Sequence, residues 1–527
     1  MKQSTTIRFY DCTLRDGAQG PGINLSLSDK VRLARAMDEF GIDFIEGGWP
    51  GANPKDTEFF QKMRQEPLHH AVLTAFGATR RPGIAAQEDK QLQALLDSGA
   101  QSIALCGKAS LMQVQKVLQA SPEENLAMIA DSIALLRRNG REVVFEAEHF
   151  FDGCASDSQY AMKTLETAWK AGAASIVLCD TNGATLPYDL NLLTAAVKKL
   201  LPQQIQLGIH CHNDSGCAVA GSLLAIRAGA TIVQGTINGF GERCGNADLC
   251  SVMPAVALKM DGYAISPSLQ LSQMTQLSRL FYELAVVRPN PQQPYVGSGA
   301  FSHKAGLHVN AVAKDTHSFE HIDPAIVGNH RSILLSEQAG ASNVALKARE
   351  QQLELAGQDE ARAVLKELKE KEAQGYSYEA ADASFKLLVQ RLLRNHQPAF
   401  AFDGFRVIVE KRGPGEKPLS EATIKVRVNG RTELTAAESS EGPVNALDLA
   451  LRKALSRFFP KVADMQLRDF KVRIIDGSHG TAAQTRVLID SEDRSSRQWS
   501  TVGVSENIIE ASWQALLDSV EYYLQLE

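Results

Sequence analysis

The stretch Ile205-Gln-Leu-Gly-Ile-His-Cys-His-Asn-Asp214 ends an apolar run with two histidines. The part up to Ile209 alternates and is apolar enough to predict a β-strand, on which residues two apart point to the same face. His210 and His212 therefore leave one side of the strand near its carboxyl end. Two such imidazoles form a chelating edge for a divalent metal, and two ligands leave positions open for water and substrate. A pair of hydrogen-bonded histidines is the alternative interpretation.

The strand before these histidines belongs to one of eight similar units within residues 1 to about 262. Each unit is a short apolar run, a turn and an amphipathic helix. The predicted strands are Ile7–Asp11, Asp43–Glu46, Ala71–Phe76, Ser102–Leu105, Val143–Ala147, Ser175–Cys179, Gln206–His210 and Thr231–Gly235, and predicted helices include Ser28–Phe40, Glu124–Arg138 and Gln159–Ala171. Eight βα units in about 260 residues are typical of a TIM barrel. We therefore predict an α/β chain in which residues 1–264 form a TIM (βα)8 barrel.

Polar residues at the strand ends distinguish this barrel from the alternative, a doubly wound open sheet. In a barrel those ends converge on one face, where active sites form, whereas an open sheet spreads them apart. Besides the two histidines, the strand-end residues are Arg15, Asp16, Glu46, Glu148, Asp180, Thr181, Glu242, Arg243 and Asn246. We expect them to surround one site.

The rest of the chain divides into two segments. Residues 265–402 are predicted to form a helical subdomain with polar loops, including a charged helical stretch at Val344–Glu372. Residues 403–527 are predicted to form an α+β domain of two βββα units with pseudo-twofold symmetry. The expected elements are the strands Phe405–Lys411, Thr423–Val428, Arg431–Glu438, Lys471–Ile475, Thr485–Asp490 and Gln498–Val504, and the helices Asn445–Phe458 and Asn507–Leu526. This segment has no concentrated set of acid/base residues, so we expect a regulatory module.

Composition limits the classes of function. The 527 residues carry a net charge of −6, which gives no support for binding to nucleic acid or anionic membranes. No apolar run approaches the ~20 residues that span a bilayer. The first residues also lack the apolar region of a signal peptide. We expect a cytoplasmic protein without nucleic-acid or membrane partners.

The stretch Asp11-Cys-Thr-Leu-Arg-Asp-Gly17 follows the first predicted strand. Asp16 can add an oxygen ligand to the two histidines, and a mixed nitrogen and oxygen set with open positions suits Zn, Mn, Fe(II), Co or Mg. A metal of this kind polarises a bound carbonyl. Arg15 beside it can hold a carboxylate or a developing oxyanion. A surface ion pair with a turn is the alternative for Arg-Asp-Gly.

Other candidates have simpler alternatives. Glu148 is a general base or a paired carboxylate, and Thr181 binds a substrate carboxylate or caps the following helix. The glycine-rich loop Gly239–Asn246 is a phosphate-binding loop or a tight turn. His303 and His308 lie outside the barrel, where a histidine commonly has no catalytic role.

Three motifs together carry a family resemblance. Asp11–Gly17, His210–Asp214 and Gly239–Asn246, in this order, resemble the metal-dependent TIM-barrel lyases and synthases that contain an Arg-Asp pair. This superfamily includes the isopropylmalate, homocitrate and citramalate synthases, the hydroxymethylglutaryl-CoA lyases and the carboxyltransferase domains. The lyases lack a C-terminal regulatory domain, and no biotinyl Met-Lys-Met site of a carboxyltransferase is present.

The resemblance to the synthases covers nearly the full chain. Phe301–Gly306 is similar to their helical subdomain, and the repeated C-terminal segment is similar to their amino-acid-binding domain. Ile45–Asp56 and Phe319–Asn329 look most like the citramalate synthases. One departure is Phe319, which stands where the family usually has a tyrosine, so a phenol that relays or donates a proton is missing there.

The resemblance also implies residue roles. It gives Asp16, His210 and His212 as metal ligands with Asn246 beside a metal-bound water, Arg15 as the group that neutralises the forming alkoxide, Glu148 and Thr181 as substrate-pocket residues, and His303 as a proton-transfer residue that reaches the partner subunit's barrel. The implied cofactor is a divalent metal (Mg, Mn, Zn or Co), and acetyl-CoA is the co-substrate.

The implied reaction is a Claisen-type condensation of acetyl-CoA with a 2-oxo acid, followed by thioester hydrolysis. With pyruvate the product is (R)-citramalate, a precursor of isoleucine, and isoleucine is the implied feedback inhibitor of a homodimer. The nearest alternative uses 2-oxoisovalerate to make 2-isopropylmalate for leucine; homocitrate synthesis is less favoured. An inactive barrel attached to an amino-acid sensor is a third interpretation, supported only by Phe319.

Overall fold

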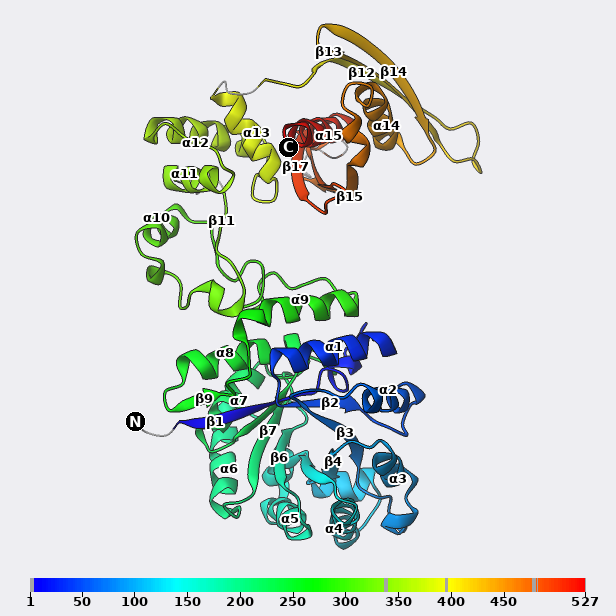
Figure 1. Cartoon of the computed structure of the whole chain (residues 1–527), viewed down its shortest axis with the longest axis vertical. Coiled ribbons are helices and arrows are strands. Elements are labelled where there is room, and N and C mark those ends of the chain that lie inside the picture. Colours follow the sequence, from blue (N-terminus) through cyan, green and yellow to red (C-terminus); the bar gives the residue numbers. More distant parts are fainter. Residues whose placement is uncertain (1–3, 336–339, 394–396, 476–479, 481, 527) are drawn as a thin grey trace. The chain divides into compact units, whose positions relative to one another are not determined.

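The computed structural model describes residues 4–335, 340–393, 397–475, 480 and 482–526. It divides into two compact units (Figure 1). Unit 1 comprises Met1–Phe301 with Ile322–His330, and unit 2 comprises Ser302–His321 with Arg331–Glu527.

Unit 1 is built on a closed parallel barrel of eight strands (Figure 1). The strands are β1 (Thr5–Asp11), β2 (Phe44–Gly48), β3 (Val72–Ala78), β4 (Ser102–Lys108), β5 (Glu142–Glu148), β6 (Ser175–Asp180), β7 (Gln206–Cys211) and β8 (Ile232–Gly235). They pair in sequence order, and β1 closes the barrel by pairing with both β2 and β8. A short strand, β9 (Tyr263–Ile265), pairs with the first residues of β1. The TIM-barrel prediction is confirmed.

Strand alternation sorts the side chains into two cores. In β1, Ile7 and Phe9 join the apolar layer between strands and helices, whereas Tyr10 joins a second cluster with Phe44, Phe76 and residues of the other strands. A parallel strand with helices packed outside is buried on both faces, which explains the nearly continuous apolar runs in the sequence.

The barrel helices mostly follow the predicted spans. They are α1 (Leu27–Phe40), α2 (Pro54–Gln65), α3 (Lys90–Asp97), α4 (Pro122–Arg138), α5 (Phe150–Ala171), α6 (Pro187–Leu200), α7 (Ala218–Arg227) and α8 (Leu249–Lys259), and α9 (Met274–Ala285) completes unit 1. Helix α5 begins earlier than the expected Gln159 because the buried Phe150 and Phe151 form an additional segment. The backbone is non-helical at Asp157, whose carboxylate accepts a hydrogen bond from the Tyr160 amide and restarts the helix.

The first part of unit 2 is helical. Its elements are β10 (Ser302–His303), α10 (Gly306–Lys314), β11 (Ser332–Ile333), α11 (Ala341–Glu350), α12 (Gln358–Ala373) and α13 (Asp382–Leu392). The continuous helical stretch expected at Val344–Glu372 is wrong. The loop after Glu350 separates α11 from α12 and ends at Gly357, whose φ of 156° favours glycine.

The C-terminal part of unit 2 repeats one motif. The first copy is β12 (Ala401–Glu410), β13 (Leu419–Val428), β14 (Arg431–Ser439) and α14 (Pro443–Leu455); the second is β15 (Gln466–Ile474), β16 (Thr485–Glu492), β17 (Gln498–Ser505) and α15 (Ile508–Gln525). Each sheet is antiparallel, and residues of both copies share one apolar core that includes Leu451 and Leu516. The predicted pair of βββα units is confirmed.

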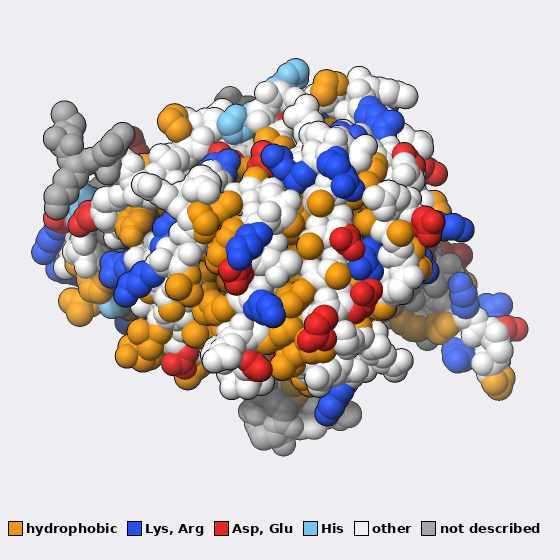
Figure 2. Space-filling model, turned by 90° about the horizontal axis from the view of Figure 1, so that it is seen from below, with side chains coloured by type: hydrophobic (Ala, Val, Ile, Leu, Met, Phe, Trp, Pro, Cys, Tyr) orange, Lys and Arg blue, Asp and Glu red, His pale blue; other side chains and the backbone are white. Residues whose placement is uncertain are grey.

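The surface in Figure 2 mixes hydrophobic, basic and acidic side chains over the face that it displays. This face has no broad area of a single charge. Across the described parts of the chain, none of the helices combines the length and the apolar character that crossing a membrane requires.

Candidate active site

Three predicted ligands converge at the carboxyl ends of β1 and β7. The His210 and His212 Nε2 atoms are 3.3 Å apart and lie 3.5 and 3.8 Å from Asp16 Oδ2. One ligand atom from each residue lies within 4.8 Å of the other two. All three side chains are buried, so the alternative of a surface ion pair at Asp16 is excluded. Cys211 packs in the outer apolar core, as strand alternation predicts.

The chemistry of these three groups fits a cation. Asp16 Oδ1 and His212 Nδ1 are buried without a hydrogen-bond partner among the described residues, and two imidazole nitrogens face each other. Burial raises the pKa of Asp16, but Arg15 and the histidines hold it well below its ordinary value. Burial and the neighbouring His210 lower the pKa of His212 to about 4. For His210, burial lowers the pKa, but Asp16 raises it above the ordinary value overall. An ionised carboxylate beside a neutral imidazole is the state that binds metal.

Asn246 lies beside this cluster because the loop before it is built from glycines. A β-carbon on Gly241 would lie 2.1 Å from Asn246 Nδ2, and one on Gly245 would lie 2.0 Å from the Gly239 carbonyl oxygen. Asn246 Nδ2 donates to the Phe240 carbonyl, and its Oδ1 is buried without a partner among the described residues. The loop therefore delivers an amide oxygen to the neighbourhood of Asp16.

Arg15 is fixed by neighbours on three sides. Its Nε donates to Glu46 Oε1 at 2.5 Å, its Nη1 lies 3.3 Å from Asp16 Oδ2, and its guanidinium lies over the Phe76 ring at 4.0 Å. Tyr10 donates to the other Glu46 oxygen at 2.7 Å. Burial lowers the pKa of Arg15, but Glu46 and Asp16 raise it well above its ordinary value. Arg15 is thus a permanent cation beside the ligand cluster.

A cavity of about 170 Å³ opens above these groups and is lined by Glu148 and Thr181 among others. Glu148 forms an ion pair with Lys108, and Cys106 Sγ lies 3.3 Å from its Oε2. Glu148 is thus a paired carboxylate, as the alternative interpretation of this residue predicts. Thr181 does not cap α6, which begins at Pro187; instead its Oγ1 accepts from the His149 amide at 2.8 Å. Its hydroxyl hydrogen is left to donate towards a ligand.

Two buried residues of this site were not predicted from the sequence. Glu146 lines the cavity, and Gln234 bridges Glu146 to His210. Burial and the charge of Glu46 raise the pKa of Glu146 to about 7. Glu146 lies two residues before Glu148 on β5, and Gln234 interrupts the apolar strand β8, so a polar residue within an apolar strand was the available signal.

The predicted histidine outside the barrel, His303, lies in unit 2 and is buried. Its Nε2 lies 3.0 Å from Glu320 Oε1, and Arg331 also binds Glu320. Burial raises the pKa of Glu320, but hydrogen bonds from Arg331 and His303 lower it overall. His308, on α10, is exposed and stacks on Phe319 with ring centroids 4.1 Å apart. Of these two histidines, the predicted proton-transfer residue His303 is the buried one.

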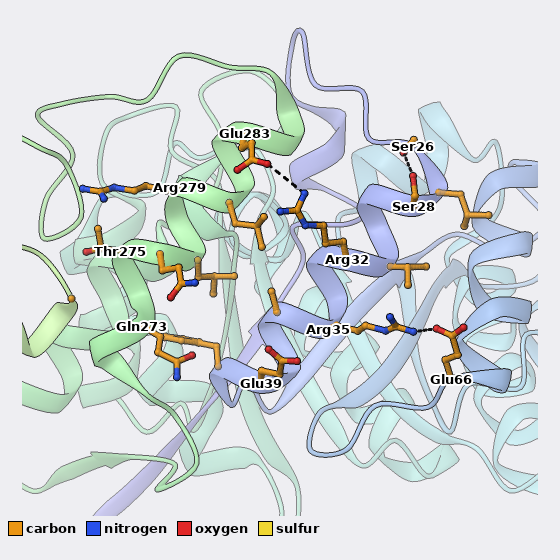
Figure 3. Close-up of a pocket in the computed structure, with 18 of the residues that line it drawn as sticks. Ser26, Ser28, Arg32, Arg35, Glu39, Glu66, Gln273, Thr275, Arg279 and Glu283 are labelled. Carbon is orange, nitrogen blue, oxygen red and sulfur yellow. Dashed lines mark hydrogen bonds and ion pairs between the residues drawn. The ribbon is translucent and has the colours of Figure 1, made fainter. Parts of the chain in front are cut away.

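A larger hollow than the cavity at the strand ends lies between α1 and α9 (Figure 3). It has a volume of about 1210 Å³ and contains the ion pairs Arg32–Glu283 and Arg35–Glu66. None of the predicted site residues lines it. Its size does not make it the active site, because the candidate metal ligands Asp16, His210 and His212 lie at the strand ends.

Three family models match consecutive parts of the chain. The HMGL-like family model matches residues 6–281, the homocitrate synthase post-HMGL domain-like model matches residues 295–375, and the LeuA allosteric (dimerisation) domain model matches residues 379–524. Among solved structures, a hydroxymethylglutaryl-CoA lyase from Pseudomonas aeruginosa is 20% identical with a TM-score of 0.46, and the match covers 55% of this chain and 96% of the lyase.

Full-length relatives are much more similar. The (R)-citramalate synthase of Synechocystis sp. is 51% identical over 99% of this chain and 97% of that protein. The (R)-citramalate synthase of Geobacter sulfurreducens is 50% identical over 98% and 97%. A 2-isopropylmalate synthase of Pyrococcus furiosus is 29% identical over 98% of each chain. The prediction of an enzyme is confirmed, and the chain belongs to the (R)-citramalate synthase family of HMGL-like condensing enzymes.

Proposed function

We propose that this chain condenses acetyl-CoA with pyruvate and hydrolyses the thioester to release (R)-citramalate and coenzyme A. The observation that carries the proposal is the buried Asp16–His210–His212 cluster beside Arg15 at the strand ends. The choice of pyruvate over 2-oxoisovalerate rests on the family, since five (R)-citramalate synthases are 42–51% identical and two 2-isopropylmalate synthases are 29% and 31% identical.

Asp16, His210 and His212 would hold a divalent metal, Mg, Mn, Zn or Co, with Asn246 beside a metal-bound water. Such a metal supplies a Lewis acid that polarises the keto group of the 2-oxo acid. The three residues leave coordination positions open for the substrate. The mixed nitrogen and oxygen donors do not select one of these metals.

Arg15 would bind the developing oxyanion and Thr181 the substrate carboxylate. Glu46 and Phe76 hold the guanidinium in one place, so little reorganisation is needed when negative charge appears on the former keto oxygen. The Thr181 hydroxyl accepts from the His149 amide, which directs its own hydrogen away from that amide. Together these donors hold the 2-oxo acid for attack on its carbonyl carbon.

Removal of a methyl proton from acetyl-CoA requires a base. Glu148 lines the cavity and is a candidate, and its carboxylate forms an ion pair with Lys108. The resemblance assigns a second proton transfer to His303, whose ring is engaged by Glu320. His308 is a second candidate for that role because its ring is exposed, and it stacks on Phe319, the residue at the usual tyrosine position.

The C-terminal βββα pair would bind isoleucine and inhibit the enzyme, and it would also join two chains into a homodimer. The match to the LeuA allosteric (dimerisation) domain supports both parts of this proposal. We place the regulatory domain at residues 403–527, after a barrel at 1–264 and a helical segment at 265–402. Biosynthesis from pyruvate and acetyl-CoA is consistent with the cytoplasm.

The test is thiol release from acetyl-CoA with pyruvate, 2-oxobutyrate, 2-oxoisovalerate and 2-oxoglutarate, together with chiral analysis of the product. We expect the highest kcat/KM with pyruvate and an (R) product. One methyl-sized difference in a pocket gives roughly 10- to 200-fold discrimination. A higher kcat/KM with 2-oxoisovalerate would replace the proposal with 2-isopropylmalate synthesis, and no thiol release with any acid would leave the sensor interpretation.

A further inference from the structure

Gln234 connects two groups of the site through a chain of hydrogen bonds. It lies on β8 in register with His210 on β7 and is completely buried. Its Oε1 is 2.8 Å from His210 Nδ1, and its Nε2 donates to Glu146 Oε1 at 2.7 Å. The proposed reaction assigns no role to this side chain.

The direction of these hydrogen bonds determines which nitrogen of His210 carries the proton. An ionised carboxylate only accepts hydrogen bonds, so Glu146 requires the NH₂ group of the Gln234 amide on its own side. The amide oxygen must then face His210, and Nδ1 must be the donor. In a neutral imidazole the proton on Nδ1 leaves Nε2 with a free lone pair. This is the nitrogen that faces Asp16 and His212.

The two histidines differ in this respect. His212 Nδ1 is buried and has no partner among the residues that the structure describes. No hydrogen bond from the described residues therefore holds the His212 ring at Nδ1, and its Nε2 meets only ligand-cluster atoms such as His210 Nε2, whereas the tautomer of His210 is set by the hydrogen bonds from Glu146 through Gln234. Among these two histidines, the hydrogen bonds through Gln234 orient the ring of His210.

We propose that Gln234 is a positioning residue, oriented by Glu146, that holds His210 in the tautomer and ring orientation that a metal requires. This inference rests on the proposed metal site. A ligand that is fixed before binding need not change its tautomer or rotate, and the loss of such a supporting hydrogen bond typically weakens metal binding by about 10–100-fold. Its direct effect is on metal affinity, before any substrate is present.

The test compares metal affinity in full-length, metal-free protein by titration with Co²⁺ at about pH 8, where Glu146 is ionised because its pKa is about 7. Gln234→Met keeps the volume but removes both hydrogen bonds, and it should raise Kd by about 10–100-fold and alter the visible Co²⁺ spectrum. Glu146→Gln frees the amide to face either way and should give a smaller increase. Thr164→Val removes a buried hydrogen bond within helix α5 that involves neither Gln234, Glu146 nor His210, and should leave Kd unchanged.

A swap separates positioning from packing. In the double variant Gln234→Glu with Glu146→Gln, the carboxylate faces His210 and the amide donates to it, so Nδ1 keeps its acceptor and Kd should return towards the wild-type value. Thermal melts identify any single variant that does not fold, and the remaining single variant and the swap then decide.

The results separate two failures. Tight binding by the wild type with Kd unchanged, within about twofold, in the folded Gln234→Met variant overturns the positioning role alone, because an order of magnitude is expected there. A Kd in the folded Glu146→Gln variant that equals the wild-type value overturns the part of the proposal in which Glu146 orients the amide. A swap that folds but binds no better than Gln234→Met also overturns it. Absence of Co²⁺ binding by the wild type overturns the metal site itself and this inference with it.

Discussion

The strand ends of the barrel and the two βββα units differ in how deeply their charged side chains are buried. At the strand ends, Asp16, Glu46 and Glu146 are buried close to Arg15, and the pKa values of Asp16, Glu146 and Arg15 are displaced from their ordinary values. In the βββα units most ion pairs are exposed, such as Lys471 with Asp490, and the shared core is apolar. Buried charges are costly, and their concentration in one place is typical of a catalytic site.

One buried charge cluster in unit 2 has a different character. Arg391 of α13 binds Asp518 and Glu521 of α15, and Ser384 also donates to Asp518. Burial raises the pKa of Asp518 despite Arg391. These contacts attach the helical segment to the second βββα copy. They suit a structural role better than chemistry, because each charge already has a protein partner.

The comparison predicts a large kinetic effect at Arg15, which is not a metal ligand. Arg15→Ala should lower kcat by roughly 10²–10³-fold, as for loss of an oxyanion donor, and Arg15→Lys should recover only part of it because the planar fork is lost. Steady-state kinetics with both substrates measure this. An unchanged kcat with a raised KM would assign Arg15 to ground-state binding.

The histidines of unit 2 provide the next test. If His308 transfers a proton, His308→Ala should lower kcat by about 10²-fold, the lower range for loss of an acid/base group. His303→Ala should then act through Glu320 and Arg331 and lower thermal stability as well. A severe loss of kcat in His303→Ala with normal stability, beside a mild His308→Ala, would return the role to His303. Phe319→Tyr should shift the pH profile of kcat only if the missing phenol matters.

Much of this site was readable from the sequence, because short motifs at strand ends fix which residues meet. Strand alternation places His210 and His212 together, and the barrel count brings Asp16 to them. Glu146 and Gln234 were not predicted, since their importance depends on the pairing of β7 with β8 and on hydrogen bonds across the barrel. The exposure of His308 and the burial of His303 likewise depend on tertiary packing. The continuous helix predicted over Val344–Glu372 was wrong, because its charged pattern does not reveal the loop that ends at Gly357.

The regulatory half of the comparison predicts a smaller effect, on inhibition. A chain ending at residue 402 should retain metal and some turnover but lose inhibition by isoleucine. Coupling of about 1–3 kcal/mol, or roughly 5–150-fold in affinity, is expected between such sites. Turnover of both chains is measured against isoleucine, leucine and valine. Equal inhibition of the two chains would place the effector site in the barrel, and no inhibition of the full chain would remove the proposed role.

The smallest predicted effect is the pH dependence of metal binding. Burial lowers and Asp16 raises the pKa of His210, with a net increase, so a falling pH places a proton on this ring in the metal-free protein. Protons then compete with the metal, and Kd for Co²⁺ should rise by up to about tenfold per pH unit once the pH falls below the pKa of His210. Titrations at a series of pH values measure the slope. A Kd that does not change with pH would mean that His210 is not a ligand.

The most direct test of the central claim is the metal content of the full-length protein. Elemental analysis should find one divalent metal per chain in the wild type and in His317→Ala, which alters an exposed histidine of unit 2. His212→Ala should contain none and should have lost nearly all turnover, because an open site with few protein ligands cannot spare one. A full equivalent of metal in His212→Ala would contradict the assignment of the site.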